Sequence, residues 1–167
     1  SSITRNEFGD LIGVTTTYFN EDNTLVKGMD IQMQYLIQLI RGEISINIMG
    51  TNLSDFKTPS LTDPNLMINR VGKFNFDSHT FSLPKKRLNS FISWNFNNYS
   101  LSLNSRYLDG YFNERIITGL GLTYGYENQV KSFFVHDVSF GKNIDITRGN
   151  LDLNLYLSNM FNKSAPR

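Results

Sequence analysis

The sequence predicts an all-β fold, an antiparallel up-and-down meander of about seven strands. Apolar and polar residues alternate in segments of roughly ten residues separated by turn signals, and helical periodicity is hard to find. The composition agrees, because aromatic residues make up 13% of the chain, and Asn, Ser, Leu and Ile are abundant. Tight turns alternate along the chain with long connections, as expected for successive hairpins.

The first hairpin is expected to turn at Arg41-Gly42. It would gather apolar residues on one face, pairing Leu39 with Ile44, Ile37 with Ile46, Tyr35 with Ile48 and Met33 with Gly50. The opposite face would carry the polar residues Asp30, Gln32, Gln34, Gln38, Ser45 and Asn47.

The second hairpin, from Arg87 to Leu108, has the clearest turn. Asn97-Asn98 tolerates the positive φ of a two-residue type I′ turn, which fixes the register. The apolar face then pairs Phe96 with Tyr99, Trp94 with Leu101, Ile92 with Leu103, Ser90 with Ser105 and Leu88 with Tyr107. The other face pairs Asn95 with Ser100, Ser93 with Ser102, Phe91 with Asn104 and Asn89 with Arg106.

A third hairpin is expected to turn at Arg148-Gly149. Its apolar face would set Ile146 near Leu151, Ile144 near Leu153 and Phe140 near Leu157. Lys142 would fall on this face, so a β-bulge near Gly141 is expected to redirect it.

The turns and connections are asymmetric. Long connections at about 56–83 and 111–129 would share one end of the sheet, and the tight turns the other. Short periplasmic turns and long extracellular loops are typical of outer-membrane barrels. The short connection 20–24 departs from this pattern; it is either a clipped loop or an interruption in one long strand from Val14 to Ile37.

The composition bears on the surroundings of the sheet. Charged residues make up only 19% of the chain, against about a quarter in soluble domains. The shortage favours a sheet that forms part of a transmembrane outer-membrane β-barrel and is not closed by itself; the alternative is a soluble β-sandwich that binds a ligand or carbohydrate. A net charge of +1 gives no indication of nucleic-acid binding, and the lack of Cys excludes disulfides and thiolate zinc sites. No apolar segment is long enough for a membrane helix, and Ser1–Asp10 lacks the apolar region of a secretory signal.

Several segments, in order, resemble the C-terminal barrel region of TonB-dependent receptors. They are Lys27-Gly28-Met29-Asp30-Ile31, Leu83-Pro84-Lys85-Lys86-Arg87-Leu88-Asn89, Ser105-Arg106-Tyr107, His136-Asp137-Val138-Ser139-Phe140 and Leu155-Tyr156-Leu157-Ser158-Asn159-Met160-Phe161-Asn162-Lys163. The last is similar to the family's penultimate-strand signature. The resemblance implies that residues 1–167 are a barrel fragment, without the family's N-terminal plug domain and its final strand.

The resemblance also implies a function. The family imports scarce nutrients such as siderophores, cobalamin-like compounds or oligosaccharides across the outer membrane of Gram-negative bacteria, with energy supplied through TonB. The expected partners are therefore outer-membrane lipid and lipopolysaccharide, the plug domain and TonB through the missing N-terminal part, and a small-molecule or oligosaccharide substrate. No nucleic-acid partner is expected.

Three groups of residues are candidates for binding, and each group has two possible roles. The polar residues Asp30, Gln32, Gln34, Asn104 and Arg106 are expected to face the lumen, where they either hydrogen-bond the plug or merely hydrate the wall. The loop aromatics Tyr111, Phe112 and Tyr124 either stack on a ligand or pack the loops together. The basic segment 84–87 either meets lipopolysaccharide phosphates or is a solvated strand start.

No catalytic motif is apparent. The two histidines, His79 and His136, lie on different segments, and His136 and its neighbour Asp137 would point to opposite faces of a strand. The glycine-rich segment 119–125 lacks the Lys and Ser/Thr of a phosphate loop. An outer-membrane lipase would require a Ser–His pair, and none can be identified from the sequence. The sequence therefore predicts no enzyme, no cofactor and no metal.

Overall fold

The computed structural model describes residues 2–15, 23–60, 63, 65–74, 81–113 and 129–166. Their regular structure is entirely β, with no helix among these residues, so the predicted fold class is confirmed. The strands form a two-stranded, a three-stranded and a seven-stranded sheet.

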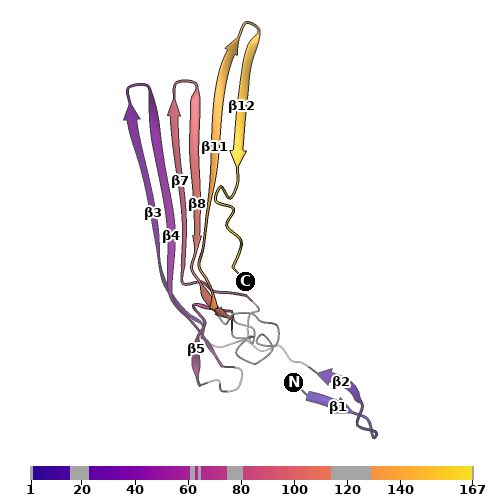
Figure 1. Ribbon diagram of the computed structural model, residues 1–167. Coiled ribbons are helices and arrows are strands. Elements are labelled where there is room, and N and C mark those ends of the chain that lie inside the picture. Colours follow the sequence, from indigo (N-terminus) through magenta and orange to yellow (C-terminus); the bar gives the residue numbers. More distant parts are fainter. Residues whose placement is uncertain are drawn as a thin grey trace.

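The seven-stranded sheet is an antiparallel meander (Figure 1). Its order is β3 (Leu25–Leu39), β4 (Gly42–Pro59), β7 (Lys86–Phe96), β8 (Tyr99–Leu108), β11 (Phe133–Ile146) and β12 (Gly149–Leu157), with the short β5 (Met67–Asn69) paired to the end of β4. The three tight turns lie at one end of the sheet, and the strand ends that flank the long connections lie at the other, as predicted. Because β3 and β12 do not pair with each other, the sheet is not closed by itself.

Two small sheets involve the remaining strands. β1 (Ser2–Arg5) pairs with β2 (Leu11–Thr15), and β9 (Tyr111–Asn113) lies between β6 (Lys73–Phe74) and β10 (Gln129–Val130). Since β2 belongs to a different sheet from β3, Val14 and Ile37 do not share one strand. The connection 20–24 lies largely outside the described residues.

The register of the β7–β8 hairpin was predicted correctly. Phe96 is opposite Tyr99, Trp94 opposite Leu101, and the remaining pairs follow to Leu88 and Tyr107. Asn97 has a φ of 49°, the left-handed conformation that Asn adopts at low cost. Asn98 does not have a positive φ, so the turn is not the type I′ turn that was predicted. Local turn chemistry was therefore enough to fix this register.

The other two hairpins turn one residue earlier than predicted, at 40–41 and 147–148, so their pairings shift by two residues. Ile37 is opposite Ile44, and Ile144 is opposite Leu151. Gly42 is the first residue of β4 rather than a turn residue. A glycine is required there because a Cβ would overlap the backbone carbonyl of Asn95 on β7. A shift of two residues preserves the faces, since side chains alternate with a period of two.

The bulge predicted near Gly141 is absent, because β11 pairs with β8 and β12 without a register shift through Lys142. Lys142 stays on the apolar face, with its Nζ 5.0 Å from the ring centroid of Tyr99. Gly141 faces the other way, where a Cβ would overlap the side chain of Ser100. The glycine therefore provides space between strands, and the register shift in this sheet lies between Lys27 and Gly28 instead.

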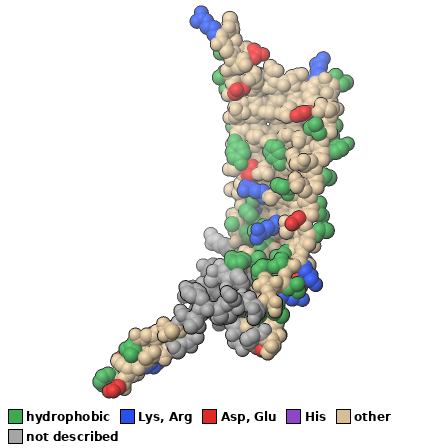
Figure 2. Space-filling model, turned by 180° about the vertical axis from the view of Figure 1, so that it is seen from behind, with side chains coloured by type: hydrophobic (Ala, Val, Ile, Leu, Met, Phe, Trp, Pro, Cys, Tyr) green, Lys and Arg blue, Asp and Glu red, His purple; other side chains and the backbone are tan. Residues whose placement is uncertain are grey.

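Each face of the sheet has its own composition. The apolar face, as set by the registers, consists of Met29, Ile31, Met33, Tyr35, Ile37 and Leu39 of β3; Ile44, Ile46, Ile48 and Gly50 of β4; Leu88, Ser90, Ile92, Trp94 and Phe96 of β7; Tyr99, Leu101, Leu103, Ser105 and Tyr107 of β8; Phe134, His136, Val138, Phe140, Lys142, Ile144 and Ile146 of β11; and Leu151, Leu153, Leu155 and Leu157 of β12. The opposite, polar face is rich in Asn, Ser, Gln and Asp. The surface seen in Figure 2 is mostly uncharged polar side chain and backbone, which matches the polar face.

In the described part of the chain, the seven-stranded sheet is a single layer. The accessible surface of the chain is 12748 Å², whereas a compact protein of its mass exposes about 8,400 Å². Trp94 and Leu101, which are opposite each other on the central strands β7 and β8, are 43% and 41% exposed. The fold therefore presents two broad, chemically different faces.

Candidate functional site

The polar face carries the five residues that the sequence predicted to face a lumen. Asp30, Gln32 and Gln34 lie on β3, and Asn104 and Arg106 lie on β8, all on this face. β4 and β7 separate the two groups, so the two strands are roughly 14 Å apart. The structure therefore places these residues on one face without bringing them into one binding site.

Arg106 belongs to a network that joins β8, β11 and the chain after β12. Its guanidinium lies 2.9 Å from Oδ2 of Asp137, which is only 3% exposed. Oδ1 of Asp137 accepts a hydrogen bond of 2.8 Å from the backbone N–H of Asn159. The sequence could not reveal this partner, because the pairing of β8 with β11 brings together residues about thirty positions apart.

Residues 158–163, here called the C-terminal turn, are held by Asn159. This residue has a φ of 48°, and its side chain bonds to both the N–H and the C=O of Lys163, at 2.8 and 3.0 Å. The N–H of Met160 donates to the carbonyl of His136 at 2.8 Å. The residue pattern on which the family resemblance depends most is therefore a turn that Asn, with its tolerance of positive φ and its amide, is suited to make.

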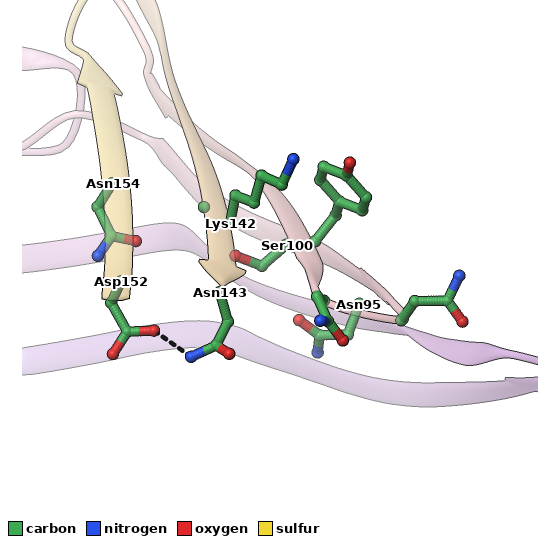
Figure 3. Close-up of a pocket in the computed structure, with 10 residues that line it drawn as sticks. Asn95, Ser100, Lys142, Asn143, Asp152 and Asn154 are labelled. Carbon is green, nitrogen blue, oxygen red and sulfur yellow. Dashed lines mark hydrogen bonds between the residues drawn. The ribbon is translucent and has the colours of Figure 1, made fainter. Parts of the chain in front are cut away.

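A polar hollow of about 340 Å³ lies near the tight turns (Figure 3). Its lining comes from the β7–β8 turn and from β11 and β12: Asn95, Asn97, Asn98, Tyr99, Ser100, Gly141, Lys142, Asn143, Asp152 and Asn154. Asn143 donates to the carboxylate of Asp152 across the two last strands. The absent side chain of Gly141 opens space beside Ser100 and Asn154. This arrangement offers amide and hydroxyl hydrogen bonds to a polar ligand or to a packed polypeptide.

The structure does contain a Ser–His pair, which the sequence did not reveal. Ser105 Oγ and His136 Nδ1 are 2.8 Å apart, as direct partners across β8 and β11. Both belong to the apolar face, and the rings of Phe134 and Phe161 flank the imidazole, at centroid distances of 4.2 and 5.4 Å. Asp137 points to the opposite face, toward Arg106, so it does not orient His136 as the acid of a catalytic triad would.

The remaining candidates from the sequence are a metal site and the aromatic residues of the long connections. Among the described residues, no three His, Cys, Asp or Glu side chains are grouped closely enough to hold a metal, and His79 lies outside those residues. Tyr111 and Phe112 are in β9, where Phe112 is exposed and Tyr111 half-buried, whereas Tyr124 is outside the described part. In that part, no helix has the length and apolar character required to cross a membrane.

Comparison of the chain with known proteins found no matching family model, no matching curated protein and no matching solved structure.

Proposed function

We propose that this chain is a wall segment of an outer-membrane β-barrel of the TonB-dependent receptor kind, which contributes to active uptake of a scarce nutrient. The observation that carries the proposal is the continuous, exposed apolar face of a single-layer meander whose other face is polar. In a barrel wall the apolar face would meet lipid, and the polar face would meet the lumen.

The strand lengths suit a membrane. β7 has 11 residues, and such a strand, tilted by about 45°, spans roughly 25 Å. That is the height of the apolar band of outer-membrane barrels. β3 and β4 are longer, with 15 and 18 residues, and extend beyond this band toward the long connections.

The distribution of aromatic residues supports the same proposal. Trp94, Phe96 and Tyr99 lie near the tight-turn end of the apolar face, and Trp94 and Phe96 are 5.7 Å apart between ring centroids. Tyr107 and Phe134 lie on that face toward the opposite end, with centroids 6.0 Å apart. Aromatic girdles at both interfaces are typical of barrel walls, because amphipathic rings favour the boundary between lipid and water.

The transport role comes from the family resemblance. It implies an outer-membrane location in a Gram-negative bacterium, a plug domain seated against the polar face, and energy supplied through TonB. The substrate class remains a siderophore, a cobalamin-like compound or an oligosaccharide. The second candidate is a soluble β-sandwich module that binds a ligand or carbohydrate, in which another sheet would cover Trp94 and Leu101.

The test uses the single tryptophan of the chain. The chain is refolded into detergent micelles that contain a quencher attached to a lipid tail, and Trp94 emission is compared with emission in buffer. The matched control moves the tryptophan to the polar face of the same strand, by Phe91→Trp in a Trp94→Phe background; Phe91 and Trp94 are equally exposed, at 43%.

Strong quenching of Trp94, weak quenching of the tryptophan at position 91, and aggregation in buffer are expected. A soluble monomer with protected, unquenched Trp94 emission would refute the barrel proposal and favour the sandwich. Equal quenching at both positions would also refute it, because the two faces would then meet the same surroundings.

A further inference from the structure

We propose that the apolar face contains a binding groove for one acyl chain of a phosphorylated glycolipid of the outer leaflet. This groove, called the Gly50 groove below, has a volume of about 230 Å³ and an apolar lining. Its walls come from four neighbouring strands: Met29 and Ile31 of β3, Gly50 and Asn52 of β4, Lys86 and Leu88 of β7, and Tyr107 of β8. The inference rests on the proposed function, because it requires that this face meet lipid.

The groove exists because β4 carries a glycine in a row of large residues. Across the sheet, Ile31 pairs with Gly50, and Gly50 pairs with Leu88. The missing side chain leaves a depression between the side chains of β3 and those of β7. The volume lies below the ~300–1,000 Å³ of sites that enclose whole small molecules, so the groove fits a segment of hydrocarbon chain.

Positive charge lies at one end of the groove. Lys86 lines the groove, is exposed and shares its face with Leu88, whereas the register places the side chain of Arg87 on the opposite face. The nearest carboxylate by strand position, Asp109, already accepts hydrogen bonds from the hydroxyl of Tyr107 and the N–H of Gly110, each at 3.1 Å. A cation beside an apolar groove complements a lipid whose acyl chain is linked to an anionic headgroup.

The kind of lipid follows from the end of the sheet at which the groove lies. Lys86 begins β7 at the end of the sheet with the long connections, which faces outward in outer-membrane barrels. The lipid in contact with that end is the acylated, phosphorylated glycolipid of the outer leaflet. Its phosphate would then lie beside Lys86, and one acyl chain would lie over Gly50.

The test measures binding of diphosphoryl lipid A to the chain refolded in non-ionic detergent micelles, by native mass spectrometry. One bound lipid A per chain is expected. Lys86→Gln should weaken binding about fivefold, the effect of one cation near an anionic lipid surface. The matched control is Lys142→Gln, which removes a lysine from the opposite end of the same face and should leave the affinity unchanged.

A second pair of variants tests the shape of the groove. Gly50→Val should fill it and weaken lipid A binding by at least about fivefold. The new Cβ would lie 3.2 Å from Cδ1 of Leu88, the end of a flexible side chain, so the strand can accept it. Gly13→Val is the control, because a Cβ at Gly13 of β2 would have nothing within 4 Å.

The outcomes separate this inference from the proposed function. Equal lipid A affinity in all four variants, or equal binding of phosphatidylglycerol, would overturn the glycolipid groove even if Trp94 is quenched by lipid tails. If lipid tails do not quench Trp94, the proposed function fails, and the groove, which requires that this face meet lipid, fails with it.

Discussion

A charge placed on the apolar face should destabilise the chain in lipid far more than the same charge on the adjacent residue of the polar face. The substitution Ile92→Arg puts a guanidinium between Ile46 and Leu103, near the middle of β7. The matched substitution Ser93→Arg adds the same side chain one residue further along the strand, between Ser45 and Ser102 of the polar face.

The size of the effect follows from depth in the membrane. An arginine at the lipid-facing midplane of a barrel costs about 2–4 kcal/mol, and one near an interface about 0–1 kcal/mol. In the proposed barrel wall, Ile92 would lie at the first of these depths, and Leu39, the last residue of β3, would lie at the second. Ser93→Arg should change the stability by no more than about 0.5 kcal/mol, as is usual for a solvated surface site.

The assay is urea unfolding of the chain refolded into lipid vesicles, for the parent chain and the three arginine variants. The expected order of destabilisation is Ile92→Arg, then Leu39→Arg, then Ser93→Arg. Equal losses for Ile92→Arg and Ser93→Arg would refute the assignment of the two faces. An Ile92→Arg loss no larger than that of Leu39→Arg would refute the membrane depth assigned to β7.

Three further predictions concern turns and close contacts. Asn97→Val should cost about 1–2 kcal/mol in urea unfolding, because a β-branched residue must adopt a φ of 49°, whereas Asn97→Gly should be nearly neutral. Gly42→Ala should cost about 1–3 kcal/mol, because its Cβ would overlap the Asn95 carbonyl, whereas Gly13→Ala has open space around it; equal effects would contradict this reading. Asp137→Asn should speed amide hydrogen exchange in the C-terminal turn, which its carboxylate holds, and Asp152→Asn should not; unchanged exchange would show that the turn does not depend on this carboxylate.

The sequence was most informative where local chemistry decides the structure. Asn97-Asn98 has a conformational preference that fixes the β7–β8 register without reference to any other strand. Gly42 was misread as a turn residue, because the reason for the glycine is the carbonyl of Asn95, more than fifty residues away. The alternation of side chains nevertheless gave the correct faces in both hairpins that shifted.

Side-chain contacts between strands that are joined by long connections could not be predicted from the sequence. The Ser105–His136 pair and the Arg106–Asp137 pair both depend on the register of β8 against β11, which is set across a long connection. The polar hollow likewise needs two separate hairpins placed side by side. The β-bulge was predicted because Lys142 is charged. Its long aliphatic chain and the ring of Tyr99 nevertheless allow this lysine to remain on the apolar face.

In this single-layer sheet with two different faces, side chains along each long strand must alternate between the faces with a period of two residues. Deleting one residue from the middle of β11 would exchange the faces of every residue between the deletion and the next turn, so Ile144 and Ile146 would enter the polar side and Asn143 and Asp145 the apolar side. Deleting two adjacent residues would only shorten the strand. Homologous chains with this architecture should therefore differ in strand length by even numbers of residues, and odd changes should be confined to the connections.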